Sequence, residues 1–228
     1  MIFRNEHTGS YLPKAFIALV ICGSICICGY LMFFEESEIV PILKPYKING
    51  NVVRNVLIIS CMWIYFLRLV ISLFVFFQRK MYWVEAIIIA NIMPWIFPYI
   101  AYISGQYSKP AGLIEAIGIG LFFIGSYLNS ASEFLRYSWK QDDQNAGRIY
   151  TGGLFKYALN INYFGDIVLF TGLALVARRV QLLIIPALMG LIFILIIIPL
   201  KENYLKQKYG EDFVKYAART KKLIPLIY

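Results

Sequence analysis

Long apolar runs constrain this chain more than any other feature of its sequence. Six stretches are long and apolar enough to be read as membrane-crossing helices, because about 20 apolar residues span the hydrocarbon core of a bilayer. They cover residues 16–34, 56–77, 84–104, 111–131, 163–177 and 180–200. The sequence therefore predicts an all-α integral membrane protein. We expect a bundle of six transmembrane helices, with seven as the alternative, and a cytoplasmic C-terminal helix.

Composition supports a membrane protein. Of the 228 residues, 60% are hydrophobic and only 15% are charged, whereas soluble domains have about half and a quarter, respectively. We expect residues 1–228 to form a single polytopic domain. The fifth run is short unless its helix begins near Leu154, and that start would place Asn162 and Asp166 in the membrane.

The net charge of +9 reflects basic residues that border the apolar runs, which indicates topology rather than a nucleic-acid partner. With six spans, the N-terminus, the second and fourth loops and the C-terminal tail share a side with 15 lysines and arginines, against six on the other. The positive-inside rule predicts a multi-pass membrane protein with both termini in the cytoplasm.

The cysteines and the histidine give no sign of a metal site. All four cysteines lie in apolar runs and are interpreted as small buried hydrophobic residues, neither disulfide-bonded nor metal-bound. The only histidine, His7, lies in the polar N-terminus. We therefore expect no multi-histidine metal centre.

Polar side chains within apolar runs are candidates for function because burying them in a bilayer is costly. Arg68 lies midway along the second run, on the same helix face as Tyr65. Two roles are equally favoured for Arg68: contact with a ligand, or a buried cation neutralised by Asp166 or Glu133. Beside an arginine, Tyr65 is a plausible proton donor.

A second polar group lies where the fourth run ends. Asn129 and Glu133 are four residues apart and Lys140 follows, an arrangement that suits ribose and phosphate but that from spacing alone fits a solvated helix end better. The glycines of the same run follow no strand, so we predict close helix packing rather than a dinucleotide fingerprint. These glycines are Gly118, Gly120 and Gly125.

Residues 129–228 contain motifs of a known family. GRIYTGGLFKY at residues 147–157 and NYFGD at 162–166 are followed by ENY at 202–204, KYG at 208–210 and RTKKLIP at 219–225. This region resembles the steroid 5-alpha-reductase family, whose members carry G-L-(W/F)-x-Y followed by N-(Y/F)-x-G-E. Three positions differ: Asp166 stands where the family usually has Glu, and Ile196 and Leu200 stand where the steroid enzymes have Arg and His.

The resemblance implies a membrane reductase that uses NADPH to reduce a carbon–carbon double bond conjugated to a carbonyl. The implied substrate is a hydrophobic small molecule from the bilayer, such as a steroid, prenol or enoyl lipid, so membrane lipids are the expected surroundings. A tyrosine paired with a glutamate would polarise the carbonyl, where a donor in a dry site is most effective. NADPH would supply the hydride and the protein its orientation.

The family's functional positions carry over by resemblance. Tyr65 matches the carbonyl-polarising tyrosine, with Arg68 beside it, and Glu36 is chosen as its carboxylate partner over Glu35 and Glu38. Seven residues match cofactor-contacting positions or lie in the same basic loop. They are Asn129, Glu133, Lys140, Arg148, Asn162, Asp166 and Tyr204.

Two other functions stay open. Isoprenylcysteine-type methyltransferases have a comparable membrane core and bind S-adenosylmethionine, but they rely on a His-Pro pair and paired glutamates where this chain has Asn160-Ile161 and Glu202-Asn203. The third alternative is a non-catalytic membrane scaffold of the same fold.

Overall fold

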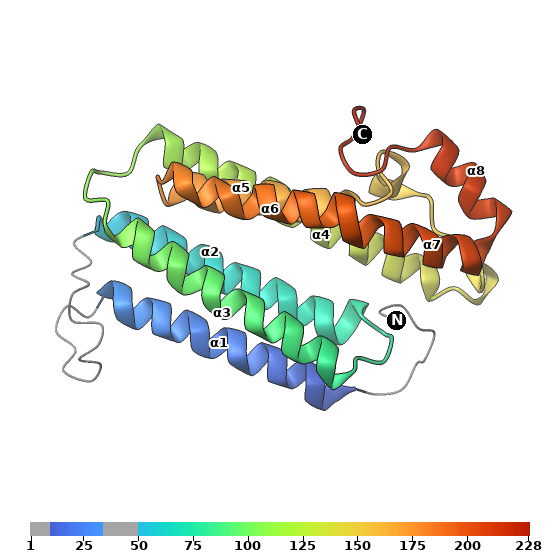
Figure 1. Cartoon of the computed structure of the whole chain (residues 1–228), viewed down its shortest axis with the longest axis horizontal. Coiled ribbons are helices and arrows are strands. Elements are labelled where there is room, and N and C mark those ends of the chain that lie inside the picture. Colours follow the sequence, from blue (N-terminus) through green and yellow to red (C-terminus); the bar gives the residue numbers. More distant parts are fainter. Residues whose placement is uncertain (1–9, 34–49) are drawn as a thin grey trace.

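The structure is a computed structural model that describes residues 10–33 and 50–228. Every secondary-structure element in these residues is a helix. The first half contains α1 (Tyr11–Phe33), α2 (Val52–Ile71) with its π-helical extension η2 (Ser72–Phe76), and α3 (Trp83–Gly105). These three helices pack against one another and form one layer of the bundle (Figure 1). The predicted all-α fold is confirmed.

The second layer begins with α4 (Leu113–Lys140) and α5 (Ile161–Val176), which make the most extensive helix pair. A continuous helical segment, Val180–Tyr209, then runs alongside α5. Its parts are the 3-10 turn η5 (Val180–Leu183), α6 (Ile184–Ile192), the π-helical η6 (Phe193–Ile197) and α7 (Ile198–Tyr209). The π-helical turn has a local cause, because Pro199 has no N–H to donate and its ring clashes with the preceding turn.

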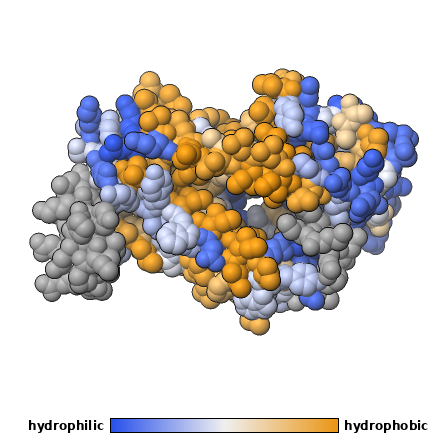
Figure 2. All heavy atoms as spheres, in the orientation of Figure 1, coloured by the Kyte–Doolittle hydropathy of each residue, from blue (hydrophilic) through white to orange (hydrophobic). Residues whose placement is uncertain are grey.

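Within the described residues, five helices are long and apolar enough to cross a membrane, namely Tyr11–Phe33, Val52–Phe76, Trp83–Gly105, Leu113–Lys140 and Val180–Tyr209. The fifth predicted run corresponds to α5, which has only 16 residues. Nine of these are buried, so α5 is surrounded mainly by protein and need not match the bilayer thickness by itself. Hydrophobic residues cover the middle of the bundle and hydrophilic ones gather at its two ends (Figure 2).

Two helix ends differ from the sequence prediction. The fourth membrane helix was predicted at residues 111–131, but α4 continues to Lys140. The last membrane helix was expected to end at residue 200, but it continues without a break to Tyr209 before α8 (Glu211–Arg219) begins. Both extensions are polar, so hydropathy does not detect them, although backbone hydrogen bonding continues through them.

Four glycines let the backbones of α4 and α5 touch, and we call this contact the glycine seam: Gly118, Gly125, Gly165 and Gly172. A Cβ on Gly125 would lie 2.4 Å from the Gly165 carbonyl oxygen, and one on Gly172 would lie 2.5 Å from the Gly118 carbonyl oxygen. Small residues allow such close approach in membranes. The packing prediction is thus confirmed for Gly118 and Gly125. It is wrong for Gly120, where an added Cβ would meet no described atom within 4 Å apart from the adjacent backbone of its own helix.

The C-terminal segment fastens the chain that leads into α5. The backbone N–H groups of Leu159 and Asn160 donate to the carbonyls of Lys221 and Lys222, at 2.8 and 3.1 Å. The Tyr216 hydroxyl of α8 donates to the Phe155 carbonyl at 2.6 Å. Burial raises the pKa of this hydroxyl. These bonds fix where α5 starts, and with it the polar side chains of its first turns.

Candidate functional site

Five polar side chains from three helices form one connected group, which we call the polar network. Arg68 comes from α2, Asn129 and Glu133 from α4, and Asn162 and Asp166 from α5. All five were predicted from the sequence to belong to the site. The glycine seam positions them, because Gly165 lies between Asn162 and Asp166 and a Cβ added to it would come within 2.7 Å of the Asn129 backbone nitrogen.

Asp166 is the centre of the network. Arg68 Nη2 lies 3.0 Å from Asp166 Oδ1, and Asn129 Nδ2 donates to Asp166 Oδ2 at 3.0 Å. Asn129 Nδ2 also reaches the Asn162 carbonyl at 3.1 Å. Because the two backbones touch, an aspartate is long enough to bridge all three helices. Of the two partners considered for Arg68, the structure selects Asp166.

The pairing leaves Arg68 with hydrogen-bonding capacity. Its Nε and Nη1 are buried and have no hydrogen-bond partner within residues 10–33 and 50–228. A buried donor without a partner is costly, so a ligand oxygen placed there would be stabilised. Pairing with Asp166 and contact with a ligand are therefore compatible.

Glu133 and Asn162 make the second half of the network. Asn162 Nδ2 donates to Glu133 Oε1 at 2.9 Å, and Glu133 also forms an ion pair with Arg136 one turn further along α4. Asn162 is buried, and its Oδ1 accepts no hydrogen bond from the part of the chain that is described. This oxygen is an acceptor available to an amide or hydroxyl group of a ligand.

Tyr65 lies beside the network in an aromatic setting. Its ring packs edge-on against Phe97 and Phe170, with centroids 5.5 and 5.7 Å away, and the Arg68 guanidinium carbon is 5.2 Å from its centroid. The predicted closeness of Tyr65 and Arg68 is present. The proposed carboxylate partner Glu36 lies outside the described residues, as do Glu35 and Glu38.

Three predicted cofactor residues lie outside the network. Lys140 ends α4 and interacts electrostatically with Glu133, Arg136 and Lys208. Tyr204 of α7 accepts a hydrogen bond at 3.4 Å from Nζ of Lys208, one turn further along the same helix. Arg148 is exposed in the loop between α4 and α5. The roles of these three residues in cofactor binding stay predictions.

Sequence reasoning missed the cations that support the network. Arg136 was detectable, since it follows Glu133 by three residues on one helix. Lys201 was not detectable. Its Nζ donates at 2.9 Å to Oδ1 of Asn160, which lies 41 residues earlier in the sequence, directly before α5. The same Nζ lies 4.7 Å from the centroid of Tyr163, whose ring stacks on Phe193 of η6.

An apolar cavity of about 530 Å³ opens between α2 and α4 beside the network. Arg68 and Ser126 line it together with aromatic and aliphatic side chains, among them Phe76 and Phe134. A cavity of this size and character suits a hydrophobic small molecule. Several of its rim side chains are exposed, so the cavity is accessible from the lipid-facing surface.

Comparison with known proteins connects this arrangement to a family. Residues 72–220 match the family model described as "Protein of unknown function (DUF1295)". The chain is 29% identical over 113 residues to 3-oxo-5-alpha-steroid 4-dehydrogenase 2 of Homo sapiens, covering 50% of this chain and 42% of that protein. It is also 29% identical over 113 residues to 3-oxo-5-alpha-steroid 4-dehydrogenase 1 of Rattus norvegicus, covering 48% and 40%.

These alignments span about two fifths of the relatives' own length, and they confirm the resemblance inferred from the motifs. The family model is broader, because it extends from η2 through α8 and includes four of the five residues of the polar network. Since the family model covers more than half of the sequence, the chain belongs to the DUF1295 family and is similar to the steroid 5-alpha-reductases.

Proposed function

We propose that this protein is an NADPH-dependent membrane reductase that acts on a conjugated carbon–carbon double bond of a lipid-like substrate. The observation that carries the proposal is the polar network, which joins the Tyr65–Arg68 face of α2 to the amide and carboxylate groups of α4 and α5. The relatives named above support a reductase. The apolar cavity beside Arg68 supports a hydrophobic substrate.

The side chains present fit the proposed cofactor. Asn162 Oδ1 and the spare donors of Arg68 are buried polar atoms without hydrogen-bond partners in the described chain, and they suit the carboxamide and hydroxyl groups of a dinucleotide. Lys140, Arg148 and Lys208 are cations at the polar end of α4 and α7, where they suit phosphates. When bound, NADPH supplies a hydride.

The residues of α2 would handle the substrate oxygen. As the double bond is reduced, negative charge develops on the conjugated carbonyl oxygen, and the Tyr65 hydroxyl is proposed to donate to it. The surroundings of Tyr65 are aromatic and dry, which strengthens such a hydrogen bond. The positive charge of Arg68 would further stabilise the negative charge on that oxygen, while Asp166 holds the Arg68 guanidinium in place.

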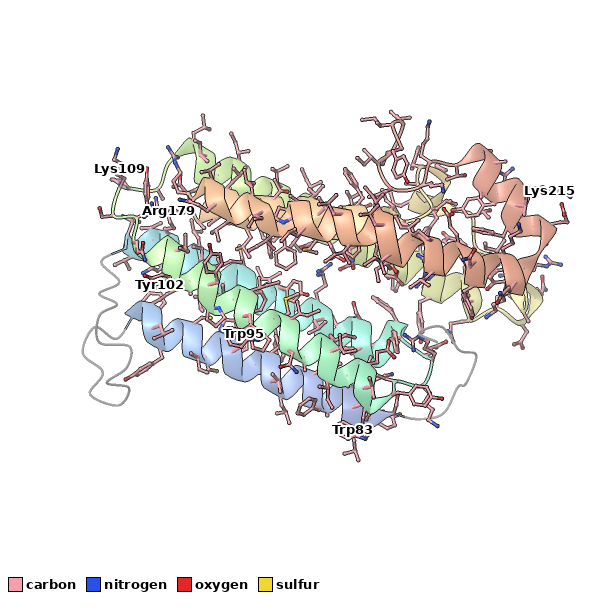
Figure 3. The ribbon with its side chains drawn as sticks, in the orientation of Figure 1. Trp83, Trp95, Tyr102, Lys109, Arg179 and Lys215 are labelled. Atoms are coloured by element: carbon pink, nitrogen blue, oxygen red, sulfur yellow. The ribbon has the colours of Figure 1, made fainter. Side chains whose placement is uncertain are left out.

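We further propose that the polar network faces the cytoplasm, as the distribution of lysine and arginine predicts. Lys215 on α8 lies at one end of the molecule, and Lys109 and Arg179 lie at the other (Figure 3). A membrane-impermeant thiol reagent should therefore label Lys215→Cys from the cytoplasmic side and Lys109→Cys from the opposite side. The reverse pattern would invert the topology.

Ligand-induced thermal stabilisation of the detergent-purified protein tests the cofactor. NADPH at about 100 times its dissociation constant should add about 2.7 kcal/mol to the free energy of unfolding, because it binds only the folded state. Asn162→Ala and Glu133→Ala should abolish this gain. Asn91→Ala is the matched control, since among the described residues the Asn91 side chain donates only to the Ile87 carbonyl of its own helix, at 2.8 Å. Stabilisation by S-adenosylmethionine alone would instead support a methyltransferase.

Turnover tests the role of Tyr65. With a 3-oxo-4-ene steroid or an enoyl lipid as probe, Tyr65→Phe should reduce the rate about 10²- to 10³-fold and leave stabilisation by NADPH intact. Tyr99→Phe is the control, because Tyr99 is exposed on α3. An unchanged rate in Tyr65→Phe would remove Tyr65 from the mechanism.

One observation favours a non-catalytic scaffold as the second candidate. Ile196 and Leu200, which occupy the positions of Arg and His in the steroid enzymes, are 51% and 44% exposed. Their apolar side chains bring no cation to the site. A protein stabilised by neither NADPH nor S-adenosylmethionine would support the scaffold.

A further inference from the structure

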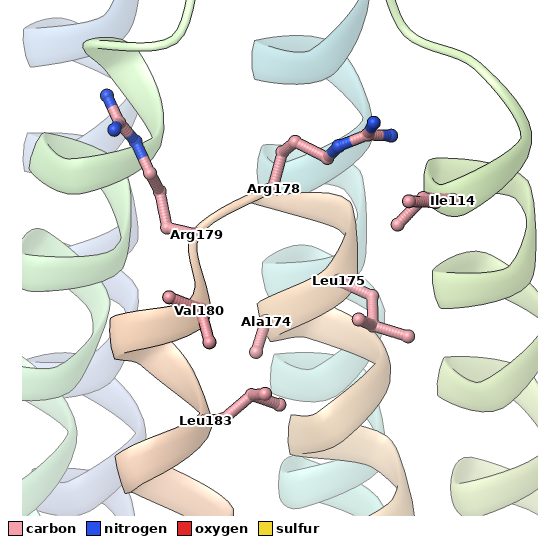
Figure 4. A pocket seen from close by; sticks show the side chains of 7 residues that line it. All are labelled: Ile114, Ala174, Leu175, Arg178, Arg179, Val180 and Leu183. Carbon is pink, nitrogen blue, oxygen red and sulfur yellow. The ribbon is translucent and has the colours of Figure 1, made fainter.

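A second cavity lies at the opposite end of the bundle from the C-terminal helix, at the turn between α5 and the following helical segment. We call it the hairpin pocket; its volume is about 250 Å³. Aliphatic side chains line its interior, including Ile114, Leu175 and Val180, and Arg178 and Arg179 stand at the turn (Figure 4). The pocket therefore combines an apolar interior with two cations at one end.

The two arginines have donors to spare. Arg178 Nη1 lies 3.3 Å from Glu115 Oε2, and Arg179 Nε donates to the Ile103 carbonyl at 3.3 Å. Each of these is the only side-chain hydrogen bond that its arginine donates within the described residues, whereas a guanidinium carries five N–H donors. The Arg178 side chain is one third exposed. Both guanidiniums can therefore take a further acceptor.

The one carboxylate bonded to Arg178 is already neutralised. Glu115 Oε1 lies 2.7 Å from Nη2 of Arg54, which is fully buried, and Glu115 Oε2 accepts from the Gly112 backbone N–H at 2.8 Å. Arg54 thus supplies one positive charge against the single negative charge of Glu115. The charges of Arg178 and Arg179 are left without a described carboxylate of their own.

The level of the arginines along the bundle suits a lipid head group. They precede Val180–Tyr209, a segment long enough to cross a membrane. Val180 and Ile184, directly below them, are 75% and 56% exposed and so present an apolar surface. Arginines at the end of a membrane helix lie at the level of the phosphates, while aliphatic side chains below them face acyl chains.

The backbone at the turn also singles out Arg178. Its φ is 56°, in the left-handed region where a long side chain is disfavoured and asparagine or glycine is common. The turn would form more easily with either of those residues. An arginine at this position is therefore better explained by what its guanidinium binds than by the shape of the turn.

We propose that the hairpin pocket binds an anionic phospholipid, with an acyl chain against the aliphatic lining and the phosphate at the turn, where the guanidinium groups of Arg178 and Arg179 lie on either side (Figure 4). Arginine matches phosphate through paired, charge-assisted hydrogen bonds. A zwitterionic lipid is disfavoured, because its ammonium group would enter a site with two cations that have no carboxylate of their own among the described residues. The site is separate from the polar network and does not depend on the proposed reductase activity.

Lipid-specific stabilisation tests the proposal. The purified protein in a neutral detergent is mixed with phosphatidylglycerol, with phosphatidylcholine of the same acyl chains, or with inorganic phosphate. Thermal unfolding and lipid adducts in native mass spectrometry are measured. We expect phosphatidylglycerol to raise the unfolding temperature more than phosphatidylcholine, and inorganic phosphate to have no effect. The double variant Arg178→Asn/Arg179→Gln should bind phosphatidylglycerol at least about tenfold more weakly.

Two variants separate the pocket from general effects. Lys109→Gln removes a positive charge at the same end of the bundle without touching the pocket, and it should retain the response to phosphatidylglycerol. Arg179→Gln alone leaves the contact between Arg178 and Glu115 in place, so it should fold normally and still lose part of the response. An undiminished response in the double variant, an equal loss in Lys109→Gln, or equal stabilisation by inorganic phosphate or phosphatidylcholine would each overturn the proposal.

Discussion

Replacing Gly125 by alanine should separate α4 from α5. The added Cβ would lie 2.4 Å from the Gly165 carbonyl oxygen and from the Leu169 backbone nitrogen. Both atoms belong to backbone and cannot rotate away, so the helices must move apart by roughly 1 Å to restore ordinary contact. The bond from Asn129 Nδ2 to Asp166 Oδ2, now 3.0 Å, would then exceed hydrogen-bonding distance.

The cost follows from overpacking, which typically destabilises a protein by about 1–3 kcal/mol; with the lost hydrogen bond we expect about 2–3 kcal/mol. For a chain of this length each kcal/mol shifts the unfolding temperature by about 2–4 °C, so Gly125→Ala should unfold roughly 5–10 °C below the wild type. Thermal unfolding in detergent, followed by circular dichroism, measures this shift. The variant should also lose its stabilisation by NADPH.

Gly120→Ala is the matched control, because it lies on the same helix and its Cβ would contact no other helix within the described part of the chain. Alanine favours helix over glycine by about 1 kcal/mol, so this variant should be as stable as the wild type or slightly more stable. The reasoning is refuted if Gly125→Ala and Gly120→Ala unfold at the same temperature, since the backbones would then not touch as described.

Two further predictions concern buried polar contacts. Glu115→Gln should destabilise the protein by on the order of 3 kcal/mol, because the fully buried Arg54 would lose its counter-charge; Lys222→Gln, which breaks an exposed ion pair, should cost less than about 1 kcal/mol in the same denaturation assay. Tyr216→Phe should cost about 1 kcal/mol at neutral pH by removing the hydrogen bond to Phe155. Because burial raises the pKa of Tyr216 above its ordinary value of 10.0, this stabilising contribution is complete below pH 10 and is lost as the pH rises further. The stability difference between wild type and Tyr216→Phe should therefore shrink in alkaline solution, and a constant difference would contradict this.

The sequence predicted the membrane helices well because run length is read directly from the order of residues. It misplaced the ends of α4 and of the last long helix, since polar residues such as Glu133 and Arg136 stabilise a helix through pairs three residues apart while lowering its hydropathy. For the short fifth run, the helix was predicted to begin either near Leu154 or at residue 163. In the structure α5 begins at Ile161, close to the second position, and it still includes Asn162 and Asp166.

The membership of the polar network was predicted, and Asp166 was one of the two partners considered for Arg68, whereas the other connections were not predicted. Whether Asn129 reaches Asp166 depends on the register of α4 against α5, and the glycine seam sets that register. The seven-residue spacing of Gly118 and Gly125, repeated by Gly165 and Gly172, is visible in the sequence. Nothing in a single sequence, however, shows that these two pairs face each other. Contacts such as that of Lys201 with Asn160 likewise arise only from tertiary packing.

The ion pair between Arg68 and Asp166 crosses from one layer of helices to the other, and the family model includes only one of its two partners. The family model begins at residue 72, so Tyr65 and Arg68 lie just outside it, whereas Asp166 lies within it. The second ion pair between the layers is divided in the same way, because Arg54 of α2 lies outside the family model and its partner Glu115 of α4 lies within it. Both of the described charged contacts that join α2 to the second layer thus pair a residue that the family model describes with one that it does not.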